Sequence, residues 1–162
     1  SSSWSALLVS AQTTTSSATD DTAKLEAARR WVEEEFQPST LSIEEQMAEM
    51  EWFIEAARPF RGLNVKVVSE IIDTHTYESE VMAQAFREIT GINLVHELIP
   101  EYDVVDTLQR QFYTRTNFYD AYVSDSDLIG THFRYSFVYP ISEYMQVNKS
   151  TVLCQSFPFE TL

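Results

Sequence analysis

The sequence is poor in cysteine, glycine and basic residues, and each shortage excludes a class of protein. Its one cysteine, Cys154, rules out an internal disulfide, and the apolar neighbours Val152 and Leu153 favour a small buried side chain over a nucleophile. The three glycines, at positions 62, 91 and 130, provide no loop that could cradle a phosphate. Lys and Arg number 11 against 25 Asp and Glu, a formal charge of −14 that repels nucleic acid and anionic lipid.

The sequence also lacks the motifs of catalysis and of membrane insertion. No window approaches the ~18 consecutive apolar residues of a membrane span, so we expect no transmembrane segment within the chain. HxxxH, HExxH and CxxC spacings are absent, and Ser126 has no GxSxG context. We therefore expect a protein that is not an enzyme and needs no metal or other cofactor. Residues that could serve as metal ligands are nevertheless available: Glu70, His75, Glu78, Asp125, Asp127 and His132.

The first 60 residues divide into a leader and two helices. Residues 1–20 are mostly Ser, Thr and Ala, a composition that predicts disorder unless a partner surface holds the segment. The stretch 4–11 is similar to the end of a secretory signal peptide, so we expect a secreted protein from which the rest of that signal has been removed. Residues 21–60 predict two amphipathic helices, the first capped by Asp20 or Asp21 and the second by a Ser42/Glu45 capping box.

From residue 61 to 147 the pattern alternates between strands and helices. A short β-branched run at 63–68, bounded by Gly62, predicts a strand, and 92–98 and 118–123 are the second and third predicted strands. Helical spacing fills 76–90 and 100–112. Gly91 suits the left-handed position that ends a helix. This alternation predicts an α/β lobe with a parallel sheet and right-handed crossovers. Residues 137–139 are a possible further strand, 141–145 a helical turn, and the tail 148–162 has no period.

Polar side chains gather where the first and third predicted strands end. The candidate ligand-binding residues are Ser69, Glu70, Thr74, His75 and Tyr77 after the first strand, and Asp125, Ser126 and Asp127 after the third. Because parallel strands bind ligands at their carboxyl ends, these groups could hydrogen-bond a sugar or polyol while the Tyr77 ring stacks on it. The alternative is helix capping, by Thr74 or Thr76 in the first group and by the aspartates in the second. His96, within an apolar strand, is expected to be structural.

Several segments together resemble a known family. They are Phe36-Gln37-Pro38-Ser39-Thr40-Leu41-Ser42, residues 46–54, Val67-Val68-Ser69-Glu70, Thr74-His75-Thr76-Tyr77-Glu78-Ser79, residues 85–92 and residues 119–132. Over about 21–147 the chain is similar to the N-terminal lobe of family 1 extracellular solute-binding proteins, in the subgroup that serves sugar or glycerol ABC importers. The resemblance implies a periplasmic protein, a cleft between two α/β lobes, the eight candidate residues at that cleft, and delivery of the ligand to a membrane permease.

The length of the chain departs from this family, whose members have several hundred residues. The 162 residues would correspond to one incomplete lobe preceded by two helices, without the second lobe that buries the ligand. Two functions follow as hypotheses. The chain is either a sugar- or polyol-binding lobe of the transport type, or a truncated lobe reused as an interaction subunit docked on a periplasmic or membrane protein complex.

Overall fold

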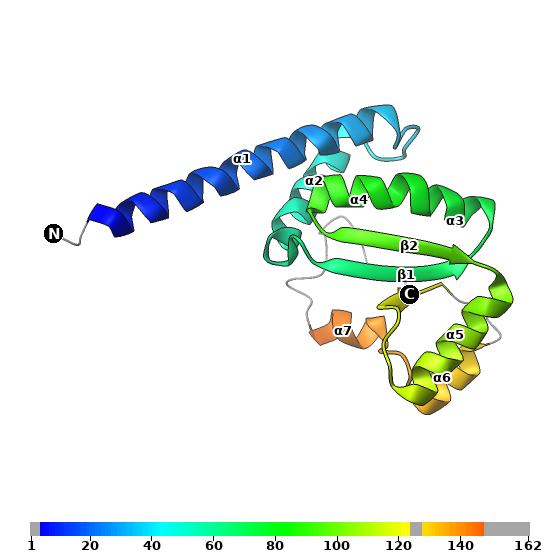
Figure 1. The fold of residues 1–162 in the computed structure, drawn as a ribbon. Coiled ribbons are helices and arrows are strands. Elements are labelled where there is room, and N and C mark those ends of the chain that lie inside the picture. The colour runs from blue at the N-terminus through cyan, green and yellow to red at the C-terminus, as the bar shows by residue number, and fades with distance from the viewer. Residues whose placement is uncertain (1–3, 124–127, 148–162) are drawn as a thin grey trace.

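The protein is an α/β structure in which two helices precede a small parallel sheet (Figure 1). The computed structural model describes residues 4–123 and 128–147, with side chains from residue 19 onward. The helices are α1 (Trp4–Glu34), α2 (Ile43–Ala57), α3 (Asp73–Tyr77), α4 (Ala83–Thr90), α5 (Glu101–Thr114), α6 (Ile129–Tyr135) and α7 (Ile141–Val147). A 3₁₀ turn, Arg58–Phe60, follows α2, and a π-helical segment, Glu78–Met82, joins α3 to α4.

The sheet confirms the predicted parallel pairing. Its strands are β1 (Asn64–Glu70), β2 (Asn93–Ile99) and β3 (Ala121–Tyr122), in the order β2-β1-β3. β1 pairs with β2 along its whole length, from Asn64 opposite Asn93 to Glu70 opposite Ile99. β3 pairs with β1 only at Val67 and Val68, so it is much shorter than the predicted 118–123.

β3 is short because a side chain takes the backbone groups that would otherwise lengthen it. The amide N–H groups of Phe118 and Tyr119 both donate to Oε1 of Gln111, at 2.7 and 2.8 Å. Gln111 also donates from Nε2 to the Tyr119 carbonyl at 3.0 Å. A buried amide on α5 thus replaces a sheet partner over the two residues that precede Asp120.

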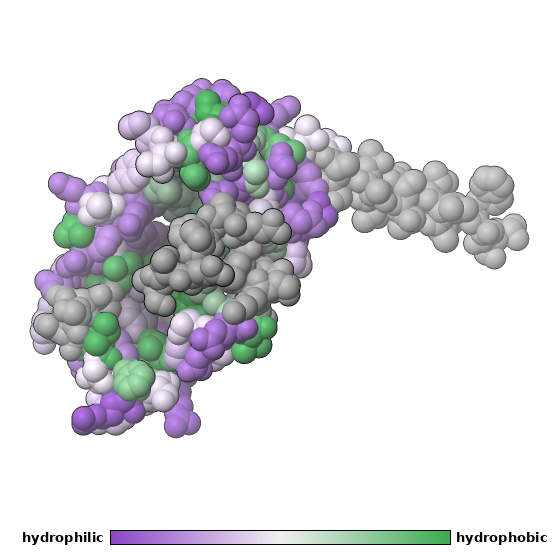
Figure 2. Space-filling model, turned by 180° about the vertical axis from the view of Figure 1, so that it is seen from behind, coloured by the Kyte–Doolittle hydropathy of each residue, from purple (hydrophilic) through white to green (hydrophobic). Residues whose placement is uncertain are grey.

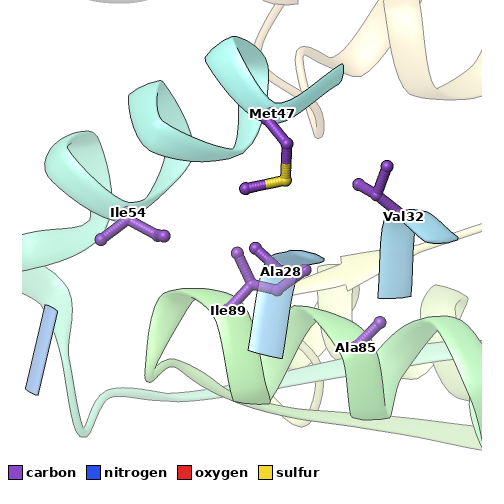
Figure 3. Close-up of a cluster of buried hydrophobic side chains, with 6 residues drawn as sticks. All are labelled: Ala28, Val32, Met47, Ile54, Ala85 and Ile89. Atoms are coloured by element: carbon purple, nitrogen blue, oxygen red, sulfur yellow. The ribbon is translucent and has the colours of Figure 1, made fainter. Parts of the chain in front are cut away.

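Helices cover both faces of the sheet, and each face has its own apolar cluster. On one face the fully buried Val68 packs with Val104 and Leu108 of α5. On the other, α4 lies over β2 and carries α1 and α2 above it (Figure 1). The second cluster joins these three helices, as Figure 3 shows, with the members Ala28, Val32, Met47, Ile54, Ala85 and Ile89. The N-terminal helices are therefore packed onto the α/β unit.

The first helix differs from its prediction. α1 begins at Trp4 and passes through Asp20 and Asp21 without a break, so these residues are not its caps. Asp20 accepts a hydrogen bond from Arg61 at 2.7 Å, and Asp21 accepts from Arg61 and Arg58 at 2.5 and 2.7 Å. The N-terminal part of α1 extends beyond the rest of the molecule (Figure 1).

Most other local predictions are confirmed. The Ser42/Glu45 capping box is present at the start of α2, and Gly91 ends α4 with a φ of 78°. Residues 141–147 form α7. The possible strand at 137–139 is wrong, because Phe137 stacks on Phe112 of α5 with ring centroids 4.7 Å apart.

Candidate ligand-binding site

The strand order places the ends of β1 and β3 next to each other. The chain leaves β1 and crosses to β2 by way of α3 and α4 on one face, then crosses back to β3 by way of α5 on the other. In open α/β sheets, ligands bind at the carboxyl ends of strands where the connections diverge in this way. The carboxyl edge of β1 and β3 is therefore the place where a site is expected from the fold.

Two of the candidate residues lie inside β1 and not after it. Ser69 is fully buried, and its hydroxyl lies 2.6 Å from Nε2 of His96 on β2. With no exposed surface and its hydroxyl occupied, Ser69 ties the two strands together, which argues against its predicted contact with a ligand. Glu70 is the last residue of β1 and is half-buried, so its carboxylate remains at the edge.

His75 is turned back towards the end of β1. Its Nδ1 lies 3.0 Å from the carbonyl oxygen of Glu70, and because a carbonyl can only accept, Nδ1 carries the proton. Nε2 is then the nitrogen left to accept a hydrogen bond in the neutral ring. The ring is 8% exposed, and its centroid lies 6.3 Å from that of His96. His75 can therefore offer one nitrogen at a nearly covered position.

His96 is held in a structural role, as predicted for this residue. Burial lowers its pKa; the Glu78 charge opposes that shift and His75 adds to it. Its carbonyl accepts a hydrogen bond from the Ser79 hydroxyl at 2.7 Å. Ser79 lies in the π-helical segment, and such segments often occur at functional sites. Sequence periodicity could not predict the hydrogen bond between Ser79 and His96, because the two residues are 17 positions apart.

The capping alternative is not supported for the threonines. The residue before α3 is Ile72, and no side chain caps the helix there. The Thr76 hydroxyl donates back to the Ile72 carbonyl at 3.0 Å, whereas Thr74 is exposed at the start of the helix. The Thr74 hydroxyl is thus available to a ligand at the β1 exit.

Of the remaining candidate residues, Tyr77 is described by the structure and the group 125–127 is not. The Tyr77 hydroxyl donates to Glu35, the residue after α1, at 2.7 Å, and this hydrogen bond raises the Tyr77 pKa. The ring is 42% exposed, so its face could still contact a ligand. Asp125, Ser126 and Asp127 lie outside the described residues, but the Val123 amide donates to the Val68 carbonyl and brings the chain to the same edge.

An apolar cavity of about 420 Å³ lies on the α4 side of the sheet. Its walls come from α2, the π-helical segment, α4 and the strands, and include Phe53, Met82, Phe86 and Val123 with His96. Figure 2, which shows the molecule from behind, has scattered hydrophobic residues on a surface that is mostly hydrophilic. This cavity differs in chemistry from the polar group at the β1 exit.

Two further features of the described residues bear on the chemistry. Within residues 4–123 and 128–147, His, Cys, Asp and Glu form no group of three that could hold a metal ion. Over the same ranges, no helix combines the length and the apolar character that a membrane crossing requires.

Comparison with protein family models, with curated proteins and with solved structures finds no match to this chain. The geometry at the β1 and β3 edge is therefore the basis for the function considered next.

Proposed function

We propose that this chain is a non-enzymatic, periplasmic-type binding lobe whose carboxyl edge of β1 and β3 takes a small neutral polar ligand, a sugar or a polyol. The observation that carries the proposal is the strand order β2-β1-β3 with helices on both faces, which supports a crevice between the ends of β1 and β3. The likeness to the N-terminal lobe of family 1 extracellular solute-binding proteins supports the same ligand class and an ABC permease as the partner.

The side chains at this edge have complementary roles towards hydroxyl groups. The Glu70 carboxylate accepts hydrogen bonds, Thr74 both donates and accepts, and Nε2 of His75 accepts when the ring is neutral. Asp125 and Asp127 would add acceptors from the β3 side. A single lobe leaves the opposite side of the ligand in water, so the affinity of this lobe alone is expected to be weak.

Saturation-transfer NMR with two open-chain polyols, glycerol and erythritol, tests the proposal. Thr74→Ala and Glu70→Gln should each reduce the saturation of ligand protons at least several-fold. Thr76→Ala and Glu26→Gln are matched controls, since the Thr76 hydroxyl faces its own helix and Glu26 is an exposed residue of α1. Equal signals from all four variants, or no signal from either ligand, would overturn the site.

The alternative function is an interaction subunit docked on a larger periplasmic or membrane protein complex. The specific observation in its favour is the apolar cavity, whose wall residues Phe53 and Met82 are 40% and 39% exposed, together with the extension of α1 beyond the body. A photo-crosslinking residue at Phe53 or Met82 should attach the chain in its native host to one common protein. A crosslinker at Tyr102, which is 80% exposed on α5, is the control. Attachment that is equal at all three positions, or absent, would exclude this reading.

A further inference from the structure

A second cavity, of about 730 Å³, lies on the α5 side of the sheet, at the start of β3. Its walls are the loop 115–120, which joins α5 to β3, and the loop 136–139, which joins α6 to α7. Asp120, one of the lining residues, lies beside Lys66 of β1, because the Asp120 amide donates to the Lys66 carbonyl. Lys66 is four residues before Glu70, the last residue of β1. The cavity is therefore separate from the carboxyl edge, and what it binds does not depend on the function proposed above.

The two walls are held firmly by contacts of different kinds. Phe137 lies between the rings of Phe112 and Tyr135, with centroid distances of 4.7 and 5.6 Å and near-parallel planes. The opposite wall is fixed by the three hydrogen bonds of Gln111 to the backbone of Phe118 and Tyr119. A cavity with fixed walls loses little entropy when a ligand binds.

Several polar side chains that line the cavity are exposed and make no hydrogen bond to another described residue. Within the described part of the chain, the side chains of Arg115, Thr116 and Asn117 make no hydrogen bond or ion pair. Asp120 uses Oδ2 to accept from the Lys66 amide at 2.9 Å, and its other oxygen makes no such bond to a described residue. Hydrogen-bonding capacity of this kind, collected in one concavity, is typical of a site that recognises a polar molecule.

The backbone is strained at both walls. Arg115 and Ser136 are the non-glycine residues of the described ranges with positive φ, at 54° and 52°. They end α5 and α6, and both line this cavity. A left-handed conformation costs a residue with a Cβ about 1–2 kcal/mol, and strain of this kind is concentrated at functional sites.

We propose that this cavity binds one ring of a carbohydrate. The planar groups of Arg115, Asn117 and Asp120 suit pairs of neighbouring hydroxyls, each of which can donate and accept. Tyr139 is 66% exposed and Tyr135 is 60% exposed, so both offer a ring to the apolar C–H face of a sugar. The charges of Arg115 and Asp120 have opposite sign, which favours a neutral ligand. The volume lies within the range of about 300–1,000 Å³ that is usual for small-molecule pockets.

Saturation-transfer NMR on the full chain tests this site with glucose, galactose, mannose, maltose and cellobiose, and with adenine as a non-sugar ring. At least one sugar should receive saturation through its ring protons, and Asn117→Ala and Tyr139→Ala should each reduce it five-fold or more. Gln109→Ala and Tyr102→Ala are matched controls on exposed positions of α5 and should leave it unchanged. All of these measurements are made in a Thr74→Ala, Glu70→Gln background, which removes sugar binding at the carboxyl edge, so the remaining signal reports this cavity alone.

Three results would overturn the assignment. The first is the absence of saturation from every sugar in protein of this background that circular dichroism shows to be folded. The second is a sugar signal that survives both cavity variants. The third is a cavity-dependent signal from adenine without one from any sugar, which would assign the cavity to flat aromatic ligands. Thr116→Val, which removes one hydroxyl from the loop with little change of volume, repeats the test if Tyr139→Ala disturbs the loop 136–139.

Discussion

Replacement of Gln111 by leucine provides a direct test of how β3 is held. The Gln111 side chain is 7% exposed, and it accepts hydrogen bonds from the amides of Phe118 and Tyr119 and donates one to the Tyr119 carbonyl. Leucine has a similar size but no polar atoms, so it leaves two amides and a carbonyl without these partners. The change therefore removes polar contacts with little loss of volume.

The expected loss of stability follows from the exposure of the groups that are left unpaired. An unsatisfied buried donor or acceptor costs about 1–3 kcal/mol, and access of water reduces that cost. Phe118 is 42% exposed and Tyr119 is half-buried, so we expect about 2–3 kcal/mol in total for Gln111→Leu. In a chain of this size each kcal/mol lowers the melting temperature by about 2–4 °C, which gives a fall of roughly 4–12 °C.

Chemical denaturation followed by tryptophan fluorescence measures the loss of stability, and amide exchange by NMR locates it. The amides of Phe118 and Tyr119 should exchange faster in Gln111→Leu and remain protected in Gln109→Leu, a change at an exposed position of the same helix. Gln111→Glu should be intermediate, because a carboxylate accepts from both amides but cannot donate to the Tyr119 carbonyl. A leucine variant as stable as the wild type, or less damaging than the glutamate, would refute the reasoning.

Three other predictions concern glycine, histidine and arginine. In a urea titration, Gly91→Ala should destabilise the protein by about 1–2 kcal/mol, since the φ of Gly91 is 78° and a Cβ there would lie 3.0 Å from Cγ of Arg61. Gly130→Ala is the control: Gly130 is helical and a Cβ there would meet nothing within 4 Å, so this change should be neutral or stabilising. Burial lowers the pKa of His132, so the unfolded chain binds a proton that the folded one does not, and stability should fall as the pH drops below about 6.5. His96, whose pKa burial also lowers, contributes to the same pH dependence. His132→Gln should therefore reduce the dependence of the unfolding free energy on pH without abolishing it, and an unchanged dependence would contradict the prediction. The hydrogen bond from Arg61 is the main reason why the pKa of Asp21 is lowered. Because solvent screens this pair, Arg61→Met should reduce the free energy of unfolding by only about 1 kcal/mol at neutral pH. That cost should shrink in thermal melts as the pH falls below about 4, and a cost independent of pH would count against the pairing.

The sequence predicted those parts of the fold that depend on neighbouring residues. The capping box of Ser42 and Glu45 and the left-handed turn at Gly91 involve residues at most four positions apart, and both are confirmed. The second strand was predicted at 92–98 and lies at 93–99, because a short segment directly after the helix-ending Gly91 identifies it without reference to the rest of the chain.

Features that depend on distant residues could not be read in the same way. The two aspartates after the Ser/Thr-rich stretch satisfied the rules for a helix cap, yet their partners are Arg58 and Arg61, about 40 residues further along. Similarly, Ser69 fitted a strand exit, but β1 continues two residues beyond its predicted end because it pairs with β2 as far as Glu70 and Ile99. Pairing across the sheet, and not local composition, determined whether that serine faced a ligand or a histidine.

The same distant contacts connect the two ends of β3. Two backbone hydrogen bonds flank its pairing with β1: Asp120 to Lys66 before the strand and Val123 to Val68 after it. Gln111 holds the residues that lead into the first of these bonds, and the second brings the chain to the carboxyl edge. Because so short a strand has no other ladder to rely on, loosening its start should also loosen its end. The Gln111→Leu variant should therefore show faster exchange at the Val123 amide as well as at Tyr119, while the amides along β2 keep their protection. Unchanged exchange at Val123 would mean that the carboxyl edge is held independently of α5.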